Sequence, residues 1–67
     1  MLKNSVRELR ARYRLTQQEL ADNAGISRQT VGLIEKGDYA PSITLALKIA
    51  QTFGVSVEEV FYLEGEN

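Results

Sequence analysis

The sequence has no cysteine and no histidine, and only one proline among its 67 residues. Without cysteine it can form neither disulfides nor thiolate nucleophiles, and without histidine it lacks the imidazole base and the commonest zinc ligand. The one adjacent acidic pair, Glu58 and Glu59, falls on neighbouring rather than facing helix positions, which makes it a poor acid-base pair. We therefore expect a protein that is not an enzyme and that holds no metal and no cofactor.

Long apolar runs are also missing. No stretch approaches the roughly 20 residues that span a bilayer, and residues 1–14 are too charged for the core of a signal peptide. We expect a cytoplasmic protein without a membrane partner. Hydrophobic residues at 43% and charged residues at 25% are ordinary globular values, and the length allows one domain, residues 1–67.

The charge is unevenly distributed. Residues 1–36 carry seven basic and four acidic side chains, a net charge of +3, whereas residues 37–67 carry one basic and five acidic side chains, a net charge of −4. A polarised molecule can present a basic face to DNA, although such asymmetry is more often a pattern of solvation. The asymmetry is therefore evidence for DNA binding only if a binding motif lies in the basic half.

Capping and turn residues predict five short helices, and no segment has the sustained alternation of a sheet. Thr16 with Glu19 and Ser56 with Glu59 form capping boxes, which mark helix starts. The predicted helices span residues 5–13, 17–24, 28–36, 43–53 and 57–60. The second and third are separated by a turn of about three residues that contains Gly25, an arrangement typical of a helix-turn-helix. The apolar tail after the fifth helix is compatible with a short strand.

Three stretches carry a resemblance to a known family: LTQQELA at 15–21, AGISRQTV at 24–31 and IEKG at 34–37. Together they resemble the Cro/C1-type helix-turn-helix family of phage and bacterial repressors, and the match continues through Pro41, Leu45, Ala50, Gly54-Val55 and Val60-Phe61. The resemblance implies a compact all-α domain of five helices with the third helix in the major groove of double-stranded DNA. It also implies a transcriptional repressor that binds a palindromic operator as a homodimer.

The first turns of the third helix are predicted to read bases. Arg28 and Gln29 have no evident role in the core, and their side chains can make bidentate pairs with guanine and adenine, respectively. Leu33 departs from the family pattern, in which a polar residue is common here; it either meets a thymine methyl group or packs against the protein. The predicted base-reading set is Ser27, Arg28, Gln29, Thr30, Gly32 and Leu33.

The resemblance also assigns contacts to the DNA backbone, which position a protein without specifying sequence. They fall at the first turn of the second helix and just after the third helix, and the predicted set is Gln17, Gln18, Lys36, Gly37 and Tyr39. Ala40 is a second departure, because some relatives have Asn at this position. The family further pairs the positions of Arg10 and Glu35 in a largely buried ion pair, which we interpret as structural.

A dimer surface is predicted at the C-terminus, in the tail of residues 60–67. Four successive apolar residues cannot all face a small core, and in compact relatives a C-terminal strand pairs with its symmetry mate. The predicted interface is Val60, Phe61, Tyr62 and Leu63. The alternative is that Phe61 and Leu63 cover the core and that the rest of the tail frays.

A second hypothesis for the function uses the same fold differently. The chain could be a protein-interaction subunit, antitoxin-like or coactivator-like, in which DNA contacts are secondary. Arg28 and Gln29 discriminate between the two hypotheses, because their replacement would leave such a function intact.

Overall fold

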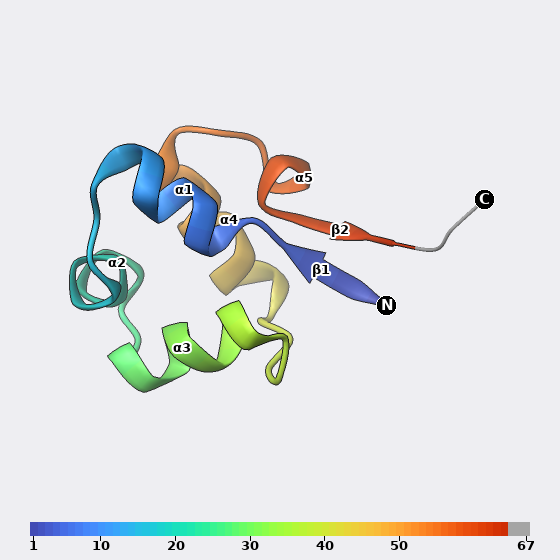
Figure 1. Ribbon diagram of the computed structural model, residues 1–67, viewed down its shortest axis with the longest axis horizontal. Coiled ribbons are helices and arrows are strands. Elements are labelled where there is room, and N and C mark those ends of the chain that lie inside the picture. Colours follow the sequence, from blue (N-terminus) through green and yellow to red (C-terminus); the bar gives the residue numbers. More distant parts are fainter. Residues whose placement is uncertain (65–67) are drawn as a thin grey trace.

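The computed structural model describes residues 1–64, which form five helices and one two-stranded sheet (Figure 1). In chain order the elements are β1 (Leu2–Asn4), α1 (Val6–Tyr13), α2 (Gln17–Ala24), α3 (Arg28–Lys36), α4 (Ile43–Phe53), α5 (Val57–Val60) and β2 (Phe61–Leu63). The five predicted helices are confirmed, and only the first has a different bound, since it begins at Val6 rather than Ser5. No helix within residues 1–64 is long and apolar enough to cross a bilayer.

The helices begin and end at residues that satisfy their terminal backbone groups. At the start of α2 the Thr16 hydroxyl accepts from the Glu19 amide at 3.0 Å, and the Glu19 carboxylate accepts from the Thr16 amide at 2.8 Å. The Ser27 hydroxyl caps α3 by accepting from the Thr30 amide at 3.1 Å. The helix α2 ends at Gly25, whose φ of 73° is readily adopted only by glycine. These local signals fix where the helix-turn-helix begins and turns.

The hydrophobic core lies between the helices, and α4 is its central element. This helix packs against α2 on one side and α5 on another, and its Ile49 is fully buried. The core residues are Val6, Leu9, Leu20, Ala21, Ala24, Val31, Ile34, Leu45, Ile49, Ala50, Phe53 and Val60. Helix α3 contributes only Val31 and Ile34 to this core, and its residues Arg28, Gln29, Leu33 and Lys36 are exposed.

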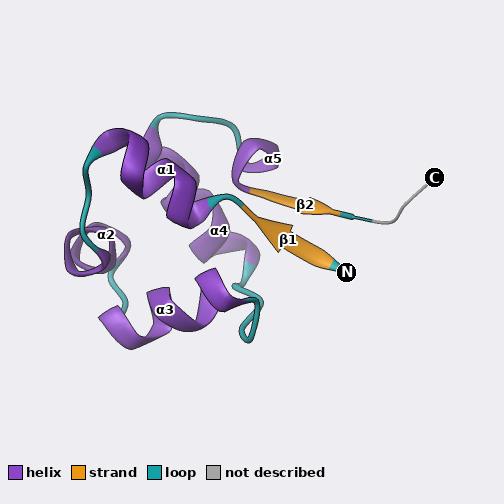
Figure 2. Ribbon diagram, in the orientation of Figure 1, coloured by secondary structure: helices purple, strands orange, loops and turns teal. Residues whose placement is uncertain are grey.

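The short C-terminal strand is present, but it has a partner that the sequence analysis did not predict. Strand β2 pairs antiparallel with the N-terminal strand β1, with Leu2 opposite Leu63 and Asn4 opposite Phe61 (Figure 2). The two strands run side by side away from the helices. The fold is therefore mostly helical with a small terminal sheet.

The sheet is attached to the helices near its inner end. The Asn4 side chain donates to the Ile34 carbonyl oxygen in α3 at 2.8 Å and accepts from the Val6 amide in α1 at 3.1 Å. The Ser5 amide donates to the Val60 carbonyl oxygen at 2.8 Å, which joins the start of α1 to the end of α5. The sheet, α1, α3 and α5 therefore meet at one point.

Candidate nucleic-acid interface

Helix α3 has a buried face and an exposed face. Val31 and Ile34 are buried against the core, whereas Arg28, Gln29, Leu33 and Lys36 are exposed. The exposed positions recur every three to four residues, so they form one continuous arc along the helix. This arc contains the side chains that the sequence analysis expected to reach bases.

The beginning of the arc combines a fixed cap with free side chains. The Ser27 and Thr30 hydroxyls lie 2.9 Å apart and hydrogen-bond to each other, so both are used in holding the first turn. Arg28 and Gln29 are exposed on that same turn, which leaves a guanidinium and a carboxamide facing solvent. The first turn thus presents two side chains capable of bidentate hydrogen bonding from a well-defined backbone.

Leu33 and Gly32 occupy the middle of the arc. Leu33 is 42% exposed, so it is not a core residue despite its apolar side chain. A Cβ atom at Gly32 would have the Gln17 Nε2 atom as its nearest neighbour, at 3.8 Å, which is ordinary van der Waals contact. Packing therefore does not require glycine at this position, although glycine costs about 1 kcal/mol of helix stability relative to alanine.

Glu35 joins the three N-terminal helices. Its carboxylate accepts from Arg10 Nε, from Arg10 Nη2 at 3.3 Å and from Gln17 Nε2 at 3.1 Å. Arg10 Nη1 donates to the Leu15 carbonyl oxygen at 3.0 Å, so most of its donors are used inside the protein. The side chains of Arg10 and Glu35 are only 18% and 7% exposed. This network, the Glu35 cluster, fixes the angle between α1, α2 and α3.

The residues expected at the DNA backbone lie at two places. Gln17 and Gln18 are on the first turn of α2, where Gln18 donates to Asp22 at 2.9 Å. Lys36 is the last residue of the arc and of α3, Gly37 and Tyr39 follow it, and all three are exposed. Sequence reasoning missed the contact of Gln18 with Asp22 and two others. Gln17 binds Glu35 as well as facing solvent, and the Lys36 ammonium lies 3.6 Å from the Asp38 carboxylate.

The expected dimer residues divide between the core and the surface. Val60 is fully buried, which corrects its assignment to an intermolecular surface, because the end of α5 closes the core. Phe61 is half-buried, and Tyr62 and Leu63 are exposed. Residues 65–67 of the expected tail lie outside the described residues. The N-terminal residues Met1 and Leu2 add to the exposed apolar surface, an addition that sequence reasoning missed.

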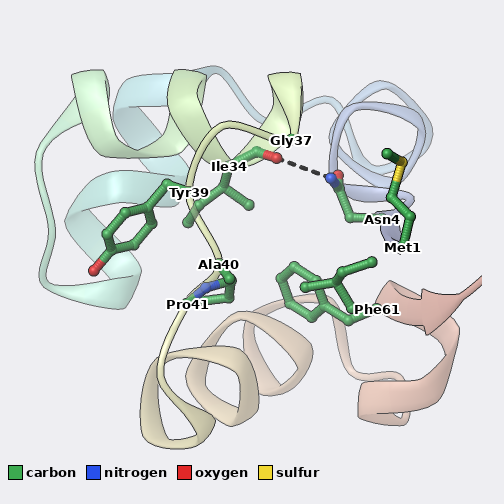
Figure 3. A pocket seen from close by; sticks show the side chains of 9 residues that line it. Met1, Asn4, Ile34, Gly37, Tyr39, Ala40, Pro41 and Phe61 are labelled. Carbon is green, nitrogen blue, oxygen red and sulfur yellow. Dashed lines mark hydrogen bonds between the residues drawn. The ribbon is translucent and has the colours of Figure 1, made fainter.

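A small pocket of about 110 Å³ lies where the sheet meets α3 and the following loop (Figure 3). Phe61 lines it from the sheet side, and Tyr39 and Pro41 line it from the loop. The Asn4 side chain points toward the Ile34 carbonyl oxygen at its edge (Figure 3). The apolar surface of the sheet is therefore continuous with the segment that follows the exposed arc of α3.

Comparison with known proteins places these features in a family context. A helix-turn-helix family model matches residues 6–60. An uncharacterized HTH-type transcriptional regulator of Bacillus subtilis, YgzD, is 54% identical over 66 residues, which cover 98% of this chain and 100% of that protein. The phage transcriptional repressor RstR of Vibrio cholerae is 32% identical over 60 residues, which cover 90% of this chain and 54% of that protein.

The crystal structure of the restriction-modification controller protein C.AhdI from Aeromonas hydrophila has the same fold, with a TM-score of 0.76 and 35% sequence identity. The superposition covers 81% of this chain and 82% of that one.

Proposed function

Since this chain belongs to the Cro/C1-type helix-turn-helix family of DNA-binding transcriptional regulators, we propose that it represses transcription by binding a palindromic operator as a homodimer. In this proposal α3 lies in the major groove, and residues 1–67 act as a single non-catalytic domain in the cytoplasm. The relative RstR is named a transcriptional repressor, which supports repression rather than activation. A dimer bound across a promoter would repress by excluding the polymerase.

The observation that carries the proposal is the exposed first turn of α3. Arg28 and Gln29 face solvent there, and each can make a bidentate base contact worth about 1 to 3 kcal/mol of discrimination. Leu33 is on the same arc, and its exposure favours contact with a thymine methyl group over packing inside the protein. The proposed base-reading set is Ser27, Arg28, Gln29, Thr30, Gly32 and Leu33.

Backbone contacts on either side of the arc would hold α3 in register. The first turn of α2 offers helix amides and side-chain amides to a phosphate, and the segment after α3 offers an ammonium, an amide and a phenol. Lys36 would exchange its contact with Asp38 for one with a phosphate. The proposed backbone set is Gln17, Gln18, Lys36, Gly37 and Tyr39.

The terminal sheet is the proposed surface for a second copy. Leu63 is 63% exposed and lies opposite Leu2, so the outer end of the sheet is apolar on one face. Within the described residues the sheet has two strands, so β2 keeps one unpaired edge that a second β2 could meet. Phe61, Tyr62 and Leu63, together with Met1 and Leu2, are the proposed contacts. Two copies would place their α3 helices about 34 Å apart, one turn of DNA.

The test begins with selection of binding sites from a random duplex library. The best site is then titrated by fluorescence anisotropy with the wild-type protein and with Arg28→Ala/Gln29→Ala. The matched control is Lys48→Ala/Gln51→Ala, which also removes one cation and one carboxamide, but from exposed positions on α4 beside the end of α2. We expect a palindromic site, a steep loss of affinity with salt, and loss of discrimination in the α3 variant alone.

A selection with no enriched sequence, or equal binding by the wild-type protein and the α3 variant, would contradict the proposal. The same result would favour the protein-interaction subunit, because the fold would then be used without base contacts. Enrichment of a single half-site would support base reading by α3 and contradict binding as a homodimer.

A further inference from the structure

An open hollow of about 380 Å³ lies where α1, α2 and α3 meet, beside the exposed arc of α3. The residues around it come from all three helices: Arg7, Arg10, Gln17, Gly32, Glu35 and Lys36. Arg7 belongs to none of the sets assigned above. The hollow is thus a feature of three helices packed together, which no stretch of sequence reveals.

Gly32 lines the hollow without a side chain of its own. Gly32 is on α3 one turn after Arg28, between that base-reading position and Lys36. A Cβ atom there would have Gln17 Nε2 as its nearest neighbour, at 3.8 Å, so a methyl group fits beside the Gln17 amide without a clash. A longer side chain at position 32 would project into the hollow and fill it.

The charges around the hollow do not cancel. Arg10 and Glu35 neutralise each other in the Glu35 cluster, and Arg7 and Lys36 remain, which gives a net charge of +2 for the six lining residues. The side chain of Lys36 is 71% exposed. Its ion-pair partner, Asp38, does not line the hollow. Gln17 uses one amide hydrogen on Glu35, so its second amide hydrogen is left for a ligand.

We propose that this hollow binds one phosphodiester group of the DNA backbone, with Arg7 and Lys36 as its charged ligands and Gln17 as a neutral donor. Arg7 supplies a planar guanidinium that matches two phosphate oxygens, and Lys36 supplies a point charge. The inference rests on the proposed function, because the hollow opens beside the arc that would enter the major groove. Arg7 is then a DNA-contacting residue of α1, outside the helix-turn-helix itself.

The experiment compares Arg7→Ala with Arg12→Ala on the selected duplex. Both arginines are exposed on α1, and both changes remove one positive charge, but only Arg7 lines the hollow. Kd is measured by anisotropy across a series of salt concentrations. We expect Arg7→Ala to reduce the slope of log K against log salt by about one and to weaken binding about threefold or more at low salt. Arg12→Ala should keep the wild-type slope, and Arg7→Lys should keep most of it.

Each outcome separates the two proposals. If the wild-type protein bound its selected duplex and Arg7→Ala had the same salt slope as Arg12→Ala, the hollow would not be a phosphate site, although the base-reading function would stand. If the wild-type protein selected no duplex, the proposed function would fail and the hollow would fail with it. Inorganic phosphate at constant ionic strength should displace duplex from the wild-type protein more readily than from Arg7→Ala, because the ion and the duplex phosphate would compete for the hollow. Equal displacement from both proteins would count against the site.

Discussion

The helix-turn-helix, which contains α3, and the terminal sheet, which contacts α3, are stabilised in different ways. In the helix-turn-helix, polar groups are paired inside the protein: Glu35 accepts from Arg10 and Gln17, and both helices have capped starts. The sheet has three residue pairs, and its outer apolar side chains Met1, Leu2 and Leu63 are exposed. The region that would read DNA is complete in one copy, whereas the sheet leaves apolar surface that a second copy could cover.

The largest predicted effect is in the Glu35 cluster. Glu35→Ala leaves the mostly buried Arg10 guanidinium without its carboxylate, so the free energy of unfolding should fall by about 3 to 5 kcal/mol. Urea denaturation followed by circular dichroism measures this change. Glu58→Ala, at an exposed position of α5, is the control and should change stability by less than about 0.5 kcal/mol. Similar values for the two variants would mean that the cluster does not hold the helices together.

The second prediction concerns the attachment of the sheet to α3. Asn4→Ala removes the hydrogen bond to the Ile34 carbonyl oxygen and leaves the part-buried Val6 amide without its side-chain acceptor. We expect a loss of about 1 to 3 kcal/mol in the free energy of unfolding. Amide hydrogen exchange should also show faster opening of β1 while α2 retains its protection. Equal loss of protection in β1 and α2 would show that the sheet and the helix-turn-helix open together, against this prediction.

The third prediction concerns the apolar end of the sheet. Leu63→Glu places a charge where the second copy is proposed to bind, so the dimer dissociation constant should rise by about tenfold or more, the effect of losing about 1.4 kcal/mol. The monomer should lose little stability because Leu63 is exposed. Sedimentation velocity across a concentration series measures the dimer. Leu47→Glu, at an exposed apolar position of α4, is the control, and a larger effect there would move the dimer surface to α4.

The smallest predicted effect is a gain. Gly32→Ala has room for its methyl group, so the higher helix propensity of alanine should raise the free energy of unfolding by up to about 1 kcal/mol. Thermal or urea denaturation measures it. A loss of stability would show that the neighbouring Gln17 amide cannot accommodate a methyl group, and that the glycine has a packing role after all.

The parts of the fold that follow from local signals could be predicted from the sequence. The bounds of α2, α3, α4 and α5 agree with the prediction because each begins at a Thr or Ser cap, and the first three end at a glycine. Strand β1 could not be predicted in this way. Its three residues, Leu-Lys-Asn, carry no pattern of their own, and its partner lies at the other end of the chain. Pairing over that distance is decided by tertiary packing.

In the candidate site, too, the parts set by local sequence could be predicted and the parts set by tertiary packing could not. The exposed first turn of α3 follows from helix periodicity, so Arg28 and Gln29 could be selected from the sequence. The burial of Val60 could not, because all four residues of the run 60–63 are apolar and the run does not show which of them faces the core. The hollow beside Gly32 required the positions of α1, α2 and α3 together, and therefore Arg7 was missed.

The hydrogen bond from Asn4 to α3 has a consequence for how the protein would respond to its own concentration. This hydrogen bond joins the strand β1 of the proposed dimer surface to α3, so ordering of either region would favour ordering of the other. Binding free energies are reciprocal: any factor by which a second copy strengthens the hold on the operator is also the factor by which the operator strengthens the dimer. The operator would then act as a template for assembly, and occupancy would rise with the square of monomer concentration wherever free protein is mostly monomeric.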